Sequence, residues 1–304
     1  MKKALIFFIA LAVFFGACSA KNKNAQDANA DQQEFGIRLG TYSGRGTPGR
    51  QYVTVIEFSS NNRIKMWEES ERSGATDLIE KSGQYVTSNE DGLDFITISW
   101  STGTQEKFLF LIEGEMGLYL YNSDSTPYFD GYGEFDKLFG DDSWIKASSS
   151  FQEMQGGETV LYSPDKLGIK IGECWVPNNE INERLTLTFP ENYYGLYISS
   201  GFVSFAKPYL YRENSRIKKI RLSDNYGNSK IVELKDTPHF QTVEYDGFNT
   251  PWEEIPDDSG FYYNDIRHVM ILNIEILEVY PGTKYTDTCV NSIFTEWAGG
   301  TGGM

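Results

Sequence analysis

The chain has 304 residues and a formal net charge of −16 at pH 7, and 40% of its residues are hydrophobic and 15% aromatic. This length suits about two domains of ~150 residues each. Such an acidic chain repels phosphate backbones and anionic lipid headgroups, which argues against nucleic acid or a bare membrane surface as a partner.

The first 17 residues have the pattern of a bacterial lipoprotein signal peptide. Lys2 and Lys3 form a positively charged start, and Ala4–Phe15 is an apolar run too short to span a bilayer as a stable helix. The Phe-Gly-Ala-Cys18 sequence that follows resembles a lipobox, with Phe where Leu is usual. We therefore expect cleavage before Cys18 and its lipidation, which makes the protein exported and anchored in the cell envelope. An ordinary signal peptide cut near Ala20 is the alternative.

Residues 18–34 contain no large apolar side chain and are expected to be a flexible tether. Residues 35–140 then alternate between short apolar strands and polar turns, which predicts an antiparallel meander that closes into a small barrel. The order of these segments is similar to that of lipocalins. The expected strands are Ile37–Tyr42, Tyr52–Phe58, Ile64–Trp67, Gly83–Val86, Leu93–Trp100, Glu106–Ile112 and Gly117–Tyr121.

A glycine-rich stretch at Ser43–Arg50 resembles a phosphate-binding loop only in composition. A true P-loop has the spacing GxxxxGK[ST] and opens a helix, and neither feature is present here. We expect a loop that joins two strands.

Residues 141–150 combine acidic residues with a serine run and are expected to link two domains, with 298–304 as a flexible tail. Between them, 151–297 again has short strands, and its last long one, Ile271–Tyr280, alternates with a slip at Leu277. Pro281-Gly282 then ends this strand in a tight turn. The other expected strands are Arg184–Phe189, Gly195–Ile198, Arg216–Leu222, Lys230–Leu234 and Gln241–Tyr245.

Three motifs of this second half resemble the glycan-binding, NADase-type translocation domain: Ile276–Phe294, Asn214–Leu222 and Leu234–Tyr245. Within the first, Tyr-Pro-Gly-Thr-Lys-Tyr-Thr-Asp-Thr is the strongest match, and the resemblance extends over Ala147–Trp297. It implies a discoidin-like (galactose-binding-like) jelly roll and a carbohydrate-binding role without catalysis, because the glycohydrolase activity of that family belongs to a separate domain.

Sugars are recognised by aromatic faces and by planar polar groups that pair with hydroxyls. Both residue types are dense between Trp175 and Tyr263, and Tyr211–Arg216 matches a motif of the resembled family. We expect this motif to make contacts with a ligand or polar contacts that the fold requires. The glycan-binding candidates are Trp175, Tyr211, Arg212, Asn214, Trp252 and Tyr262.

Cys174 and Cys289 are the cysteines left after Cys18. Export permits a disulfide between them, and two buried free thiols are the alternative. Neither has a CxxC partner, so we expect no metal and no cofactor. A structural Ca²⁺ on turn acids is a minor alternative, with Asp141, Asp142 and Asp165 as its candidates.

We expect no enzymatic activity. His239 and His268 are isolated and have the sequence context of structural residues, and no GxSxG or HExxH motif is present. The predicted function is therefore non-catalytic binding of a glycan or a surface protein. An alternative is a carrier of a small apolar ligand in the first barrel, with Phe58, Trp67, Phe95, Trp100 and Phe110 lining it.

Overall fold

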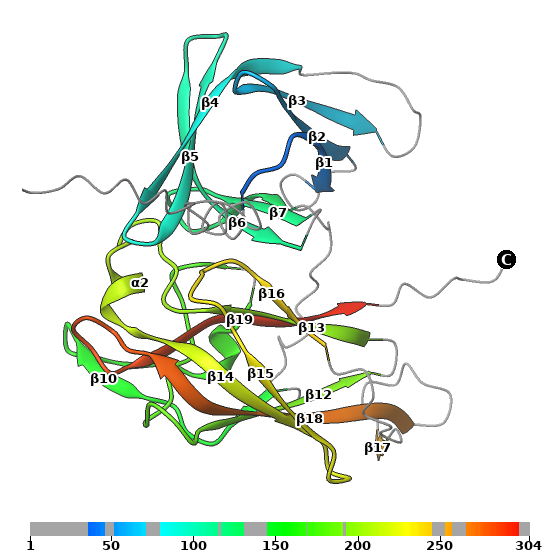
Figure 1. Cartoon of the computed structure of the whole chain (residues 1–304), viewed down its shortest axis with the longest axis vertical. Helices are drawn as coiled ribbons and strands as arrows, with labels where there is room; N and C mark the ends of the chain where they lie inside the picture. The colour runs from blue at the N-terminus through cyan, green and yellow to red at the C-terminus, as the bar shows by residue number, and fades with distance from the viewer. Residues whose placement is uncertain are drawn as a thin grey trace, which may run out of the picture. The chain divides into compact units, whose positions relative to one another are not determined.

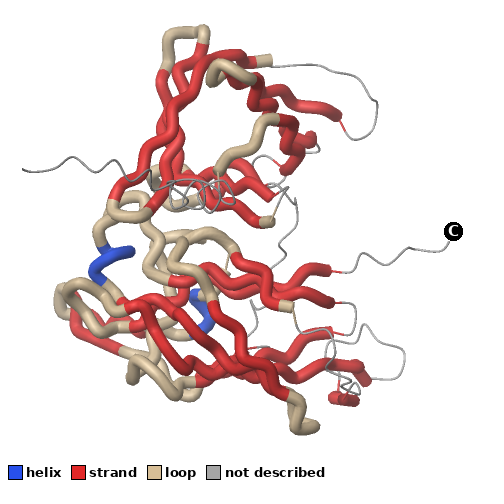
Figure 2. Tube along the Cα trace, viewed as in Figure 1, coloured by secondary structure: helices blue, strands red, loops and turns tan. Residues whose placement is uncertain are grey.

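The computed structural model describes residues 36–45, 52–70, 80–114, 117–130, 145–168, 170–190, 193–244, 253–256 and 266–297. Its elements all lie in one compact unit, Ile37–Met304. Almost all of the regular structure is strand, as Figure 2 shows in red. In these ranges the helical elements are a 3-10 turn, η1 (Pro164–Lys166), and a short helix, α2 (Leu210–Glu213), and no helix is long and apolar enough to cross a membrane.

The first eight strands form a closed antiparallel barrel in which each strand pairs with the next (Figure 1). It closes where Arg45 of the first strand pairs with Asp130 of the last, which confirms the predicted barrel. The first strand includes Ser43–Arg45, so the glycine-rich stretch begins as strand. The strands are β1 (Gly40–Arg45), β2 (Tyr52–Ser59), β3 (Arg63–Ser70), β4 (Lys81–Glu90), β5 (Leu93–Trp100), β6 (Gln105–Glu113), β7 (Gly117–Tyr121) and β8 (Pro127–Asp130).

Three strands of the barrel, β5, β6 and β7, are buried on both faces. In β6, Phe108 and Phe110 point into the barrel and join the cluster that fills it, whereas Leu109 and Leu111 belong to the other core, which lies mainly in the second half of the chain. A strand with both faces buried needs a continuous apolar run, and β6 has one from Phe108 to Ile112.

The barrel interior is packed with aromatic and aliphatic side chains. The Phe58 ring meets the rings of Tyr42 and Tyr85 edge-on at 5.7 and 5.0 Å. Of the five aromatic residues expected to line a cavity, Phe58, Trp100 and Phe110 belong to this interior cluster. Phe95 faces outward into the other core, and Trp67 is half-buried.

The second half forms a β-sandwich, as predicted (Figure 1). Its strands run in the order β16-β13-β19-β14-β18-β12-β9, and β15 and β17 pair onto β14 and β18. The step from β14 to β19 is a short parallel contact between Ser215–Arg216 and Thr288–Cys289, and every other step is antiparallel. The strands are β9 (Ile145–Ala147), β12 (Arg184–Pro190), β13 (Tyr193–Ser200), β14 (Ser215–Ser223), β15 (Ser229–Glu233), β16 (Gln241–Val243), β17 (Glu253–Pro256), β18 (Ile266–Tyr280) and β19 (Thr288–Trp297).

The slip at Leu277 corresponds to a β-bulge. Ile220 of β14 pairs with Ile276, but Lys219 pairs with Glu278, so Leu277 is passed over in the register. One extra residue in a strand reverses the faces of all residues beyond it. The bulge therefore lets Ile276 and Val279 both contribute to the core although three positions separate them.

Residues of the segment before β16 join the sandwich to the barrel. Phe240 donates its N–H to the Ile112 carbonyl (3.0 Å), and its ring lies 5.0 Å from those of Tyr119 in β7 and Phe294 in β19. The neighbouring His239 is buried and accepts the N–H of Ile112 at Nδ1 (3.2 Å), so that Nε2 carries the proton that faces Asp94 (3.0 Å). His239 is thus a structural residue, as expected.

Because barrel and sandwich share a core, they should unfold together. We expect Phe240→Ala to lower the free energy of unfolding by about 3–5 kcal/mol, since it leaves a cavity between the two. Denaturant unfolding followed by near- and far-UV circular dichroism should give one coincident transition for both proteins. Two resolved transitions in the unmodified chain would contradict the shared core, and Tyr226→Ala, at an exposed turn, is the control that should change little.

Candidate functional site

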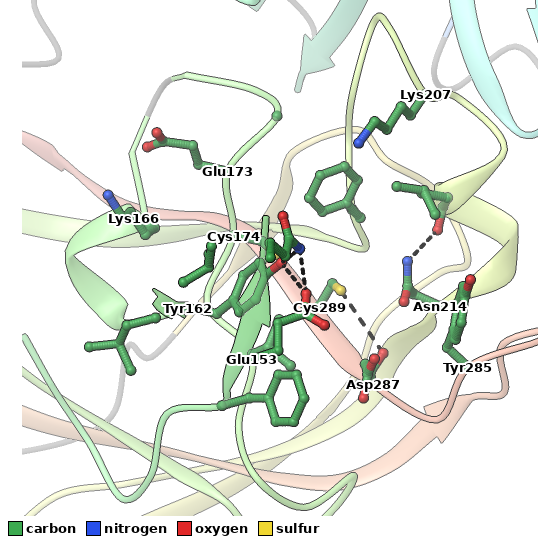
Figure 3. A pocket seen from close by; sticks show the side chains of 18 residues that line it. Glu153, Tyr162, Lys166, Glu173, Cys174, Lys207, Asn214, Tyr285, Asp287 and Cys289 are labelled. Atoms are coloured by element: carbon green, nitrogen blue, oxygen red, sulfur yellow. Dashed lines mark hydrogen bonds between the residues drawn. The ribbon is translucent and has the colours of Figure 1, made fainter. Parts of the chain in front are cut away.

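A cavity of about 540 Å³ lies in the sandwich half of the chain (Figure 3). Its wall combines segments that are far apart in sequence: the hairpin of β10 (Gln152–Gln155) and β11 (Glu158–Leu161), the stretch after η1, the residues around α2, and the turn between β18 and β19. The polar and aromatic residues of the wall are Phe151, Glu153, Gln155, Tyr162, Lys166, Glu173, Phe202, Lys207, Asn214, Tyr285 and Asp287.

The hairpin positions the first acidic residue of this pocket. Gly156 and Gly157 both have positive φ (60° and 93°), as a two-residue turn between antiparallel strands requires. Alternation along β10 then places Glu153 and Gln155 on one side and exposes Met154 on the other.

Glu153 is held by two donors. Its Oε1 accepts hydrogen bonds from the Tyr162 hydroxyl (2.7 Å) and from Nε2 of Gln155 (2.5 Å), and these lower the pKa of the Glu153 carboxyl. Burial and the bond to Glu153 raise the pKa of Tyr162. The Tyr162 ring also stacks on Phe151, with 6.2 Å between the ring centres. This side of the pocket therefore carries a negative charge that two hydrogen bonds hold in place.

The wall has two further carboxylates, Glu173 and Asp287, and the second of these is the more informative. Burial, and to a smaller extent the negative charge of Glu153, raise the pKa of Asp287. Its backbone carbonyl accepts the Ser215 N–H (2.9 Å), but no residue in the described part of the chain hydrogen-bonds its carboxylate. The carboxylate oxygens of Asp287 are thus available to a ligand.

Two cysteines line the deeper part of the pocket. Cys174 and Cys289 are 1% and 3% exposed, are free thiols, and hydrogen-bond to each other. This contact and complete burial raise the pKa of Cys289 well above its ordinary value. The Cys289 sulfur is therefore held as a neutral thiol, which is a poor nucleophile and a poor metal ligand.

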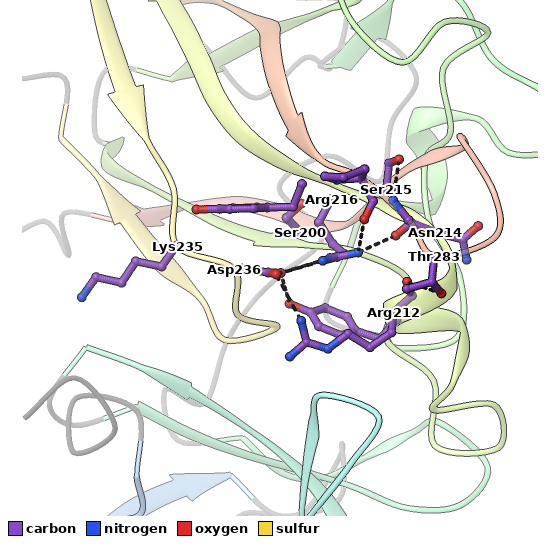
Figure 4. Close-up of polar contacts among 12 residues, drawn as sticks. Ser200, Arg212, Asn214, Ser215, Arg216, Lys235, Asp236 and Thr283 are labelled. Atoms are coloured by element: carbon purple, nitrogen blue, oxygen red, sulfur yellow. Dashed lines mark hydrogen bonds and ion pairs between the residues drawn. The ribbon is translucent and has the colours of Figure 1, made fainter. Parts of the chain in front are cut away.

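The Tyr211–Arg216 motif lies beside the pocket and makes polar contacts within the protein (Figure 4). Arg216 pairs with both carboxylate oxygens of Asp236, through Nε (3.0 Å) and an NH₂ group (2.8 Å). Arg212 also reaches Asp236 (3.1 Å), and the buried Tyr211 hydroxyl lies 3.4 Å from it. Burial and the Asp236 charge raise the pKa of Tyr211. The side chains of the motif thus support the fold.

Of the glycan-binding residues predicted from sequence, some are buried in the core, one lines the pocket, and others lie outside the described residues. Trp175 and Tyr211 are fully buried, and Trp175 donates Nε1–H to the Ser149 carbonyl (3.0 Å), so neither ring has a face free for a sugar. Asn214 lines the pocket. Cys18, Asp141, Asp142, Trp252 and Tyr262 lie outside the described residues. Where the structure does describe the chain, no group of His, Cys, Asp or Glu is arranged to hold a metal ion.

Sequence reasoning did not single out Glu153, Tyr162, Tyr285 and Asp287. The Gly-Gly pair at 156–157 was a signal for the hairpin that carries Glu153. Tyr285 and Asp287 stand inside the Tyr-Pro-Gly-Thr-Lys-Tyr-Thr-Asp-Thr run that carried the resemblance.

A comparison with known families agrees with this arrangement. Residues 144–296 match the model of the NAD glycohydrolase translocation F5/8 type C domain, which covers half of the chain. No curated protein and no solved structure matches the chain. A discoidin-like domain of this kind is a binding or translocation-related module and fits an exported protein. The chain therefore belongs to the family of the NAD glycohydrolase translocation F5/8 type C domain.

Proposed function

We propose that this chain is an exported, non-catalytic binding protein that holds a glycan in the pocket of its discoidin-like domain. One observation carries the proposal: aromatic rings share one 540 Å³ cavity within the matched residues with the carboxylate of Asp287, which no residue of the described ranges hydrogen-bonds. This volume suits one or two sugar rings.

The residues of the wall supply what a sugar needs. Rings of Tyr162, Phe202 and Tyr285 can pack against the apolar C–H face of a pyranose. The carboxylates of Glu153 and Asp287 can accept hydroxyl hydrogens, as charge-assisted hydrogen bonds. The packed interior of the first barrel, by contrast, does not favour the alternative of an apolar ligand carrier.

Glycan-array binding by the full chain tests the proposal. We expect saturable binding that Tyr285→Ala weakens roughly tenfold, because removal of one ring costs about 1–1.5 kcal/mol of stacking. Tyr226→Ala is the matched control, since Tyr226 is 50% exposed on the hairpin turn between β14 and β15, and Tyr285 is 38% exposed.

A second matched pair isolates the carboxylate. Glu153→Gln should weaken binding, whereas Glu158→Gln, on the other strand of the same hairpin and outside the pocket wall, should not. Binding unaffected by the Tyr285 and Glu153 substitutions would place the ligand elsewhere, and cleavage of an array glycan would contradict a non-catalytic role.

Asp287→Asn should change stability and binding in opposite directions. A raised folded-state pKa means that the native protein binds the proton more tightly than the unfolded chain does, so stability falls as the pH rises past 3.8. The variant should therefore melt at a higher temperature than the unmodified protein at pH 7, and the difference should vanish below pH 3.8. Glycan affinity at pH 7 should decrease. Equal melting temperatures at pH 7 would refute the cost assigned to this carboxylate.

We further infer that the protein is anchored in the cell envelope by acyl chains on Cys18. The positive start, the apolar run and the Phe-Gly-Ala-Cys18 sequence support this.

Growth of the expressing bacteria with a labelled fatty acid tests the anchor. The chain should take up the label and partition into detergent, and Cys18→Ser should abolish both. Ser19→Ala, the neighbouring change, should leave both intact. A mature protein that begins after Ala20 and carries no label would show that an ordinary signal peptide is removed instead.

A further inference from the structure

The strongest feature outside the proposed glycan contacts is the pair of buried thiols. Cys174 and Cys289 are far apart in the sequence of the sandwich domain. Each directly precedes one of the two residues of an isolated antiparallel bridge, in which Trp175 pairs with Val290. That bridge has two hydrogen bonds, from the Trp175 N–H to the Val290 carbonyl and back, each 3.0 Å long.

Alternation about this bridge places both thiols on the same face. Trp175 and Val290 point into the main core, so the residues next to them point to the other side. There Cys174, Val176 and Cys289 form a small apolar cluster of their own. The two thiols meet in this cluster, which explains why they hydrogen-bond to each other.

We propose that Cys174 and Cys289 form a disulfide bond when the exported chain folds in an oxidising compartment. The two side chains are in contact and lie on one face. The segment of Cys174 meets β19 through a single bridge and not a long ladder, so this segment can adjust to disulfide geometry against the strand that holds Cys289. The bond would staple the segment before Trp175 to the start of β19 and fix the wall of the pocket.

The oxidant is a disulfide-bearing donor, either a protein thiol–disulfide oxidase or a small disulfide. One cysteine thiolate attacks the donor disulfide and releases one donor thiolate, and the second cysteine then displaces the other. Two S–H bonds are lost and one S–S bond forms, while two electrons and two protons pass to the donor, which leaves as two thiols. Because the folded protein buries both sulfurs, a disulfide donor cannot reach them there, so this exchange takes place during folding.

The test uses the full chain with Cys18→Ser, so that Cys174 and Cys289 are the remaining thiols. The reduced, unfolded protein is refolded either in a mixture of oxidised and reduced glutathione or in excess reductant. After oxidative refolding we expect no free thiol under denaturing conditions and one cross-linked peptide pair, 174 with 289, by mass spectrometry.

Thermal stability gives a second, independent readout. A bond that closes a loop of more than about 100 residues should raise the melting temperature of the oxidised protein by roughly 10 °C over the reduced one. In the Cys174→Ala, Cys289→Ala double variant the two refolding conditions should give the same melting temperature.

Two free thiols after oxidative refolding, or disulfide-linked dimers in place of the internal bond, would overturn the proposal. The comparison of oxidised and reduced unmodified protein decides the question even if the double variant does not fold. None of these readouts depends on a glycan, so failure here is separate from failure of the proposed function.

Discussion

The sandwich depends on the ion pair between the buried Arg216 and the half-buried Asp236. The Arg216 side chain is only 6% exposed, and its donors reach both oxygens of Asp236 and the carbonyls of Asn214 and Pro281. It thereby ties the start of β14 to the segment before β16 and to the turn that leads to Tyr285. Loss of Asp236 would leave the buried Arg216 charge without its carboxylate. Breaking a fully buried pair in this way typically costs about 3–5 kcal/mol, and the partial exposure of Asp236 lowers that cost. The pocket wall rests on the same pair, because Asn214 and that turn both line it.

Much of the fold was predictable because strand periodicity is a local property. The expected strands from Tyr52 to Tyr121 correspond to β2–β7, and the slip at Leu277 marks a real change of register. The double burial of β5–β7 was not predictable, although the apolar run of β6 is its trace. The apolar run shows that both faces of β6 are covered. It does not identify what covers the outer face, because Phe240 and the other sandwich residues that pack there lie more than about 100 positions later in the chain.

The site was less predictable for the same reason. An aromatic residue between strands has the same local pattern whether it meets solvent or core, and the burial of Trp175 is set by its pairing with Val290. The charge of Glu153 acts on Asp287 only after the hairpin and the last turn have met in the folded chain. The family motif nevertheless contained Tyr285 and Asp287, so the resemblance identified the right segment even though it did not point to these side chains.

The outward-facing side chains of β5–β7 limit how far the family domain can be separated from the rest of this chain. Leu109, Leu111 and Tyr119 of the barrel belong to the same buried cluster as Phe240 and Phe294 of the sandwich. A fragment that keeps only residues 144–296 lacks these barrel side chains. The apolar face of the sandwich that they cover would then be exposed to water, and such surfaces promote aggregation. In this protein the family domain is therefore not a portable module, and gene fusions or truncations that treat it as one would need a replacement cover for that face.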